Sequence, residues 1–156
     1  MNLFMPYKSV IKSVRALDDR RLVKQILECK VMLDIALGKK SGYSKHPVCV
    51  HYKDYPDFIH GYGMWACIEY AHRFDKLHKY AAEFSRCIAE IYMGTPLLYA
   101  AGSKGSKDCI RTTENVTELF QQKLIEKWNN DKVPPKWTNR GMPEFYKEKQ
   151  NVEQTK

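Results

Sequence analysis

Four residues with chemically active side chains recur at helical spacing in one stretch of the chain. They stand at positions i, i+3, i+4 and i+7, and they are Arg21, Lys24, Gln25 and Glu28. Residues at these intervals lie on one side of an α-helix. A carboxylate among cations on a helix that faces nucleic acid can act on a sugar or base while the cations bind phosphates. The plainer alternative is an exposed Lys24–Glu28 ion pair, which stabilises a helix by only about 0.3–0.5 kcal/mol.

The placement of charge along the chain indicates a polyanionic partner. The 156 residues carry a formal net charge of +8. The first 45 residues hold ten basic and four acidic side chains, a net charge of +6, and the rest of the chain is nearly neutral at +2. A basic segment on a neutral body is typical of a surface that binds nucleic acid. We expect double-stranded DNA or a phosphorylated nucleotide as partner, with no membrane and no obligate protein partner.

Hydrophobic periodicity predicts the helices that position these residues. The predicted helices cover residues 18–38, 58–73, 79–93 and 114–129, with Pro56 in the first turn of the second. Alternation of the kind that marks a strand is absent from the pattern. We therefore predict an all-α, compact single domain of four or five main helices. Residues 1–131 form its body, and residues 132–156 form a tail of Pro, aromatic and charged residues whose packing on the body stays open.

Cysteine and histidine spacing predicts neither disulfides nor a metal site. The five cysteines are an odd number and contain no C-x-x-C, so buried free thiols are expected. The five histidines lack the H-x-x-x-H spacing of a metal site, and we predict no metal and no cofactor. The chain shows no signal-peptide pattern and no apolar stretch of about 20 residues. We expect a cytoplasmic protein, in the host cytoplasm if it is viral.

Two stretches of the sequence carry a family resemblance. The chain opens with Met-Asn-Leu-Phe-Met-Pro-Tyr, and residues 17–28 read Leu-Asp-Asp-Arg-Arg-Leu-Val-Lys-Gln-Ile-Leu-Glu. With Gly42-Tyr43 and His46-Pro47, this resembles the pyrimidine-dimer DNA glycosylase (endonuclease V-type) superfamily, most closely an uncharacterised branch found in bacteria and phages. The resemblance covers residues 1–75. It implies an all-helical, endonuclease V-like fold that cleaves the N-glycosidic bond of a damaged pyrimidine and nicks the abasic site.

The resemblance also implies roles for particular residues. The chain's α-amine, at Met1, is the expected nucleophile at the sugar C1′, and Glu28 is the expected carboxylate that stabilises the Schiff base. An α-amine has a pKa near 8, so a useful neutral fraction exists at neutral pH. The expected nucleic-acid contacts are Arg20, Arg21, Lys24, Gln25, Tyr43, Lys45 and His46. Tyr43 and Trp65 are candidates to hold a flipped base, although the helical pattern favours the core for Trp65.

The predicted function is that of a DNA repair N-glycosylase, with AP-lyase activity as its possible second step. It acts on a damaged or modified pyrimidine through a Schiff base at the N-terminal amine, assisted by Glu28. One alternative is a non-enzymatic DNA-binding module on the same fold, for which Glu28→Gln leaves binding unchanged. Another is an enzyme or binder of single nucleotides, for which the salt dependence of binding is shallow.

Overall fold

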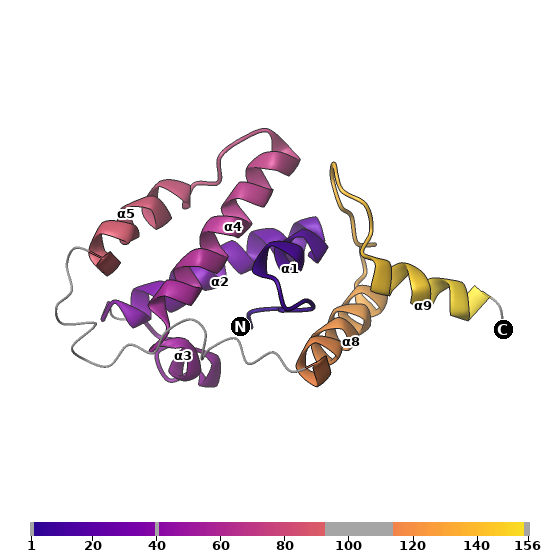
Figure 1. Cartoon of the computed structure of the whole chain (residues 1–156), viewed down its shortest axis with the longest axis horizontal. Helices are drawn as coiled ribbons and strands as arrows, with labels where there is room; N and C mark the ends of the chain where they lie inside the picture. The colour runs from indigo at the N-terminus through magenta and orange to yellow at the C-terminus, as the bar shows by residue number, and fades with distance from the viewer. Residues whose placement is uncertain (1, 40, 93–113, 155–156) are drawn as a thin grey trace.

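The computed structural model describes residues 2–39, 41–92 and 114–154, and the regular elements in these ranges are all α-helices (Figure 1). The helices are α1 Val10–Ala16, α2 Asp19–Ala36, α3 Pro47–Tyr52, α4 Pro56–Phe74, α5 Ala81–Tyr92, α8 Glu114–Asn130 and α9 Glu144–Gln154. Helix α4 packs along α2, and α1 and α5 pack against α4. Helices α8 and α9 lie at the other end of the molecule from α5 (Figure 1). One core cluster runs through these elements, which confirms the predicted all-α single domain.

Helix α2 forms around one apolar stripe. Its fully buried side chains include Leu22, Ile26, Cys29 and Leu33. These residues stand at i, i+4, i+7 and i+11, so they share one face of the helix and pack into the core. The opposite side leaves Arg20 and Lys24 exposed to solvent. The predicted helix over residues 18–38 is therefore confirmed.

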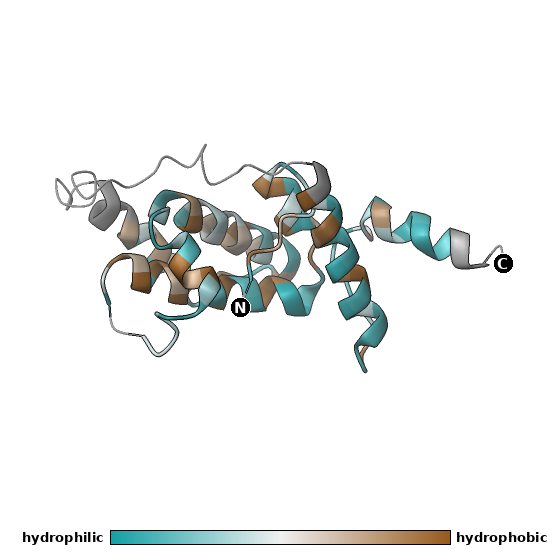
Figure 2. Cartoon of the chain, turned by 90° about the horizontal axis from the view of Figure 1, so that it is seen from below, coloured by the Kyte–Doolittle hydropathy of each residue, from teal (hydrophilic) through white to brown (hydrophobic). Residues whose placement is uncertain are grey.

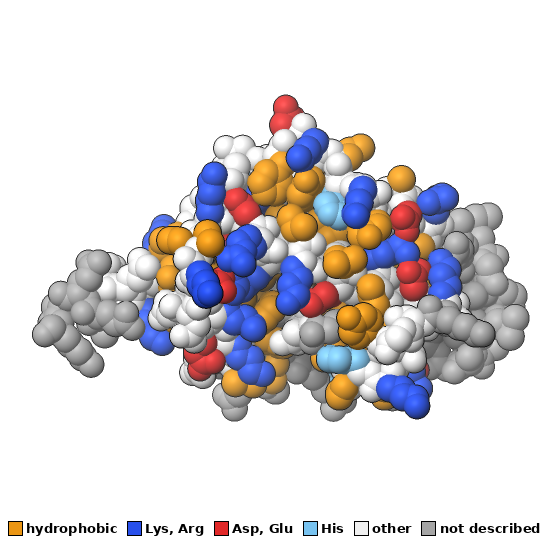
Figure 3. All heavy atoms as spheres, turned by 180° about the vertical axis from the view of Figure 1, so that it is seen from behind, with side chains coloured by type: hydrophobic (Ala, Val, Ile, Leu, Met, Phe, Trp, Pro, Cys, Tyr) orange, Lys and Arg blue, Asp and Glu red, His pale blue; other side chains and the backbone are white. Residues whose placement is uncertain are grey.

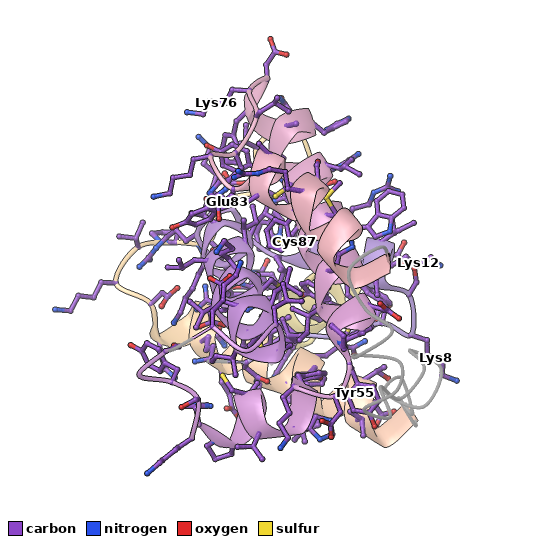
Figure 4. All side chains as sticks on the ribbon, turned by 90° about the vertical axis from the view of Figure 1, so that its left-hand side faces the viewer. Lys8, Lys12, Tyr55, Lys76, Glu83 and Cys87 are labelled. Carbon is purple, nitrogen blue, oxygen red and sulfur yellow. The ribbon has the colours of Figure 1, made fainter. Side chains whose placement is uncertain are left out.

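Helices α4 and α5 meet at a glycine. Helix α4 starts at Pro56. Proline lacks a backbone N–H, and in the first turn of a helix that N–H would have no acceptor within the helix. A Cβ atom placed on Gly63 would lie 2.4 Å from the ring of Phe84 on α5, so the missing side chain allows the two helices to approach. Helix α5 also contacts α2, because Glu83 Oε2 lies 3.0 Å from Lys30 Nζ. Figure 4 labels Glu83 on α5.

The first residues of the chain run through the interior without forming a helix. Leu3, Phe4 and Met5 are all buried. Tyr62 Oη on α4 donates a hydrogen bond to the Phe4 carbonyl at 2.7 Å. Gln121 Nε2 on α8 donates to the carbonyl of Pro6 at 2.8 Å. The start of the chain is therefore held by helices that come from distant parts of the sequence.

A segment after α8, here called the strap and comprising residues 131–143, ties α8 to the body. Thr138 Oγ1 donates to Asp19 Oδ2 at 2.7 Å, and Trp137 Nε1 donates to the Ala16 carbonyl at 2.9 Å. Arg140 Nε and Nη2 donate to the two carboxylate oxygens of Glu69 at 2.8 and 2.9 Å. These bonds fix the end of α8 beside the start of α2. Beyond its first turn, α9 is mostly hydrophilic (Figure 2).

The structure adds detail to the helices and thiols predicted from the sequence. All four predicted long helices are present, and α1, α3 and α9 accompany them. Two of the added helices have only seven and six residues, too short to show an apolar period. The cysteines in the described residues are free and buried, as predicted, and Cys109 lies outside those residues. The placement of Trp65 in the core is wrong: it is 39% exposed, because it lies off the α4 stripe of Ile59, Tyr62 and Ala66.

Candidate functional site

Glu28 lies against the start of the chain. Its Oε2 accepts hydrogen bonds from the Asn2 backbone N–H at 3.1 Å and from Gln25 Nε2 at 2.8 Å. Its Oε1 lies 3.8 Å from Lys24 Nζ. The Glu28 side chain is only 10% exposed, whereas that of Lys24 is 69% exposed. The ion pair of the plainer alternative therefore exists, but its carboxylate is buried and not on a solvated face.

Gln25 lies beside Glu28 in the interior. Its Nε2 also donates to the Asn2 carbonyl at 2.6 Å, and its Oε1 accepts from the Phe4 N–H at 3.0 Å. The residue is 1% exposed. This predicted nucleic-acid contact thus has its amide bonded to the first residues of the chain.

A cleft of about 880 Å³ opens over Glu28. Its lining residues come from the chain start, α2, α8 and the strap: Asn2, Phe4, Arg20, Arg21, Lys24, Gln25, Glu28, Lys123, Glu126, Lys127, Asn130 and Asp131. Five of these side chains are basic and three are acidic, so the cleft is net positive. The side chain of Arg20 is 60% exposed, and like Lys24 it can reach a phosphate in solution.

Arg21 is held by carboxylates. Its Nη1 lies 3.0 Å from Asp18 Oδ1 and 2.9 Å from Asp131 Oδ2, and its side chain is 11% exposed. Burial acts to lower the pKa of Arg21, but the bonds to Asp131 and Asp18 outweigh it and raise the pKa above its ordinary value. Arg21 therefore links α2 to the strap, and its largely buried side chain forms part of the cleft wall.

Helix α8 contributes two cations that sequence reasoning did not select. Lys123 and Lys127 stand one helical turn apart and line the α8 side of the cleft. In the sequence they are neighbours of the apolar positions that set the period of this helix. Their i,i+4 spacing was the available signal. This spacing indicates a wall of the cleft only in combination with the strap, which brings α8 beside α2.

Three predicted contacts lie outside the cleft. Tyr43, Lys45 and His46 belong to the segment between α2 and α3, and none of them is among the cleft-lining residues. His46 forms the N-cap of α3, where its Nδ1 accepts from the Val48 N–H at 3.2 Å. Tyr43 is 57% exposed. The structure brings Arg20, Arg21, Lys24 and Gln25 together with Glu28, but not these three residues.

The groups that could serve as nucleophiles differ sharply in their environment. Met1, with the predicted amine, lies outside the described residues, but its nitrogen is only three covalent bonds from the Asn2 nitrogen that contacts Glu28. Burial raises the pKa of the Cys67 thiol to about 12, and it also raises the pKa of Cys29. These thiols are neutral at physiological pH and poor nucleophiles. The chain start, by contrast, contacts the Glu28 carboxylate through the Asn2 N–H.

One face of the molecule carries many basic side chains. Lys and Arg are spread over the face seen in Figure 3, with apolar and acidic side chains among them. Across the ranges that the structure covers, no three His, Cys, Asp or Glu side chains gather in a way that could hold a metal ion. Within the same ranges, no helix combines the length and apolar character needed to cross a membrane.

Comparison with known proteins places the first half of the chain in a family. Residues 1–80, slightly more than half of the chain, match the family model described as pyrimidine dimer DNA glycosylase. The matched region includes Asn2, Gln25 and Glu28, whereas α8 and its lysines lie beyond it. No curated protein and no solved structure matches the chain. The chain belongs to the pyrimidine dimer DNA glycosylase family.

Proposed function

We propose that the protein is a DNA N-glycosylase with AP-lyase activity, acting on a damaged or modified pyrimidine within an endonuclease V-like fold. One observation carries the proposal: the Glu28 carboxylate lies 3.1 Å from the Asn2 nitrogen at the chain start, beneath a net positive cleft. The family membership supplies the reaction class.

The first step of the proposed reaction is attack by the chain's α-amine. The nitrogen lone pair forms a bond to the sugar C1′, and the N-glycosidic bond breaks. The base leaves with the bonding electron pair and takes up a proton. The attached amine loses one of its two protons, and its lone pair forms the C1′=N bond as the C1′–O4′ bond breaks. The electron pair of that bond goes to O4′, which takes up a proton, and the product is a protonated imine between the protein and C1′.

Glu28 stabilises the positive charge that develops in this reaction. The imine is cationic, and a buried carboxylate fixed beside it stabilises that charge without reorganisation. The same carboxylate can remove the C2′ proton, after which the bond between C3′ and the 3′-phosphate oxygen breaks by β-elimination. This second step is the AP-lyase activity, and water then releases the protein from the sugar fragment.

The cations of the cleft hold the DNA backbone in this proposal. Arg20, Lys24, Lys123 and Lys127 come from two helices and line one cleft, so they can contact phosphates on both sides of the reacting sugar. The cleft volume of about 880 Å³ is within the range of nucleotide-sized ligand sites. Tyr43, Lys45 and His46 enter the proposal as contacts with the flanking duplex, because they lie outside the cleft.

The identity of the reactive nitrogen is part of the proposal. If Met1 is retained, its α-amine is the nucleophile and the Asn2 N–H stays a peptide group bonded to Glu28. If Met1 is removed, the Asn2 nitrogen itself is the free amine, already 3.1 Å from Glu28. Mass analysis of the intact N-terminus distinguishes the two forms.

The experiment that tests the function uses duplexes that each carry one defined lesion. The set includes a cyclobutane pyrimidine dimer, several oxidised or alkylated pyrimidines, an abasic site and undamaged DNA. Base release and strand nicking on one of the damaged duplexes, but not on undamaged DNA, support the proposal. Tight binding without base release or nicking indicates the DNA-binding module instead. Binding of mononucleotides alone, with shallow salt dependence, indicates the nucleotide-level alternative.

A further inference from the structure

Gln25 connects the two groups on which the proposed reaction depends. Its Nε2 donates to Glu28 Oε2 at 2.8 Å and to the Asn2 carbonyl at 2.6 Å, while its Oε1 accepts from the Phe4 N–H at 3.0 Å. Glu28 in turn accepts from the Asn2 N–H at 3.1 Å. Two side chains three residues apart on α2 thus bind the backbone of residues 2 and 4 at three points.

We infer that Gln25 is a positioning residue, which holds Glu28 and the chain start at the separation that imine formation needs. The inference rests on the proposed function. Gln25 is 1% exposed and its amide is occupied by protein groups, so a DNA phosphate is not its partner. Through one amide nitrogen, Gln25 bonds both to Glu28 and to the Asn2 carbonyl. A shift of about 1 Å in such a pair can lower a rate about 100-fold.

An amide suits this position better than a carboxylate. Gln25 donates to two acceptors at once and adds no charge beside Glu28. A glutamate at position 25 would place two carboxylates in hydrogen-bond contact, and such a pair keeps one proton between them until the pH exceeds a raised, shared pKa. The other charged groups at the cleft are the same in the wild type and the variant: Arg20, Arg21 and Lys24 on α2, Lys123, Glu126 and Lys127 on α8, and Asp131 on the strap.

The experiment compares Gln25→Met, Gln25→Glu and the matched control Gln122→Met, which alters an exposed glutamine of α8 outside the cleft lining. Single-turnover borohydride trapping on abasic duplex gives the rate of imine formation at saturating DNA, and a titration gives the Kd. Gln25→Met is expected to slow trapping about 10- to 100-fold with Kd within about twofold of wild type. Gln25→Glu is expected to lose trapping activity as the pH rises, along a limb that the wild type lacks.

A second measurement is independent of DNA chemistry. Amide hydrogen exchange at Phe4 reports the bond to Gln25 Oε1, and Gln25→Met is expected to accelerate it about tenfold, as for the loss of one hydrogen bond. If wild type traps nothing while Phe4 exchange still responds, the proposed function fails, whereas the hydrogen bonds by which Gln25 holds the chain start stand. Unchanged Phe4 exchange in Gln25→Met, a parallel pH profile in Gln25→Glu, or a changed Kd with an unchanged trapping rate overturns the positioning role.

Discussion

At the scale of single residues, burial separates the roles of neighbours on one helical face. Lys24 and Glu28 are adjacent on α2, yet the cation is exposed and the carboxylate is covered by the first residues of the chain. The spacing in the sequence predicted that Lys24, Gln25 and Glu28 share a side of the helix. It could not predict which of them is buried, because the covering segment comes from about twenty residues away and belongs to no periodic element.

The lysines of α8 give a prediction at this scale. Replacing Lys123 or Lys127 by Ala removes one of the proposed phosphate contacts, so we expect weaker binding to every duplex sequence and a salt slope smaller by about one per variant. Binding titrations between low and physiological salt measure both quantities. Lys147→Ala on α9, outside the cleft lining, is the control and should leave the slope unchanged. A slope that does not change in either α8 variant removes this helix from the interface.

At the scale of elements, patterns within a helix can be recognised in its own sequence, whereas contacts between helices cannot. The stripe of Leu22, Ile26 and Leu33 and the position of Pro56 are local signals, and both predicted the observed helices. Helix α1 has its own local signal, since Ser9 accepts from the Lys12 N–H as an N-cap, but seven residues are too few to show a period. The close approach of α4 and α5 at Gly63 leaves no local signal at all.

Gly63→Ala tests that approach. The added methyl group meets the buried Phe84 ring at 2.4 Å, and overpacking of this kind costs about 1–3 kcal/mol in the free energy of unfolding. Gly61 is on the same helix and has no atom within 4 Å of an added Cβ, so Gly61→Ala is expected to stabilise by about 0.5–1 kcal/mol. Urea denaturation of both variants makes the comparison. Equal stabilities for the two variants would contradict the packing described for α4 and α5.

At the scale of the whole molecule, the strap decides where the second wall of the cleft stands. Arg21 and Asp131 are 110 residues apart in the chain and 2.9 Å apart in the structure. Trp128 on α8 reaches Asp18 at the start of α2 in the same way, with Nε1 donating to Oδ1 at 2.8 Å. Pairings of this kind have no periodicity, so the half of the site on α8 could not be predicted from the sequence, whereas the half on α2 could.

Acid should loosen the strap. Burial acts to raise the pKa of Glu69, but hydrogen bonds from Arg140 and Arg73 outweigh it, and the pKa lies below its ordinary value. A carboxyl group with a lowered pKa in the folded state stabilises the fold above its unfolded pKa, near 4.5. That stabilisation is lost as the pH falls through the lower folded value.

The variant Arg140→Met tests the contribution of the Glu69–Arg140 contact to the free energy of unfolding. At pH 7 we expect a loss of about 2 kcal/mol in the free energy of unfolding, because Glu69 loses both hydrogen bonds from the strap. At pH 3 the difference from wild type should shrink, since the variant has less carboxylate stabilisation to lose. Arg86→Met, on an exposed arginine of α5, is the control at both pH values. A difference that stays constant with pH argues against the Glu69–Arg140 contact.

The central claim is that an amine at the chain start reacts with DNA under the influence of Glu28. The most direct measurement is borohydride trapping on an abasic duplex, followed by mass mapping of the modified peptide. Glu28→Gln is a suitable comparison because glutamine keeps an oxygen that can accept from the Asn2 N–H. The account predicts a covalent adduct on the N-terminal residue of the wild type, its loss after acetylation of the α-amine, and a drop of about 100-fold or more in Glu28→Gln with DNA binding retained. No adduct in the wild type, or an adduct on a lysine side chain that persists after N-terminal acetylation, would contradict it.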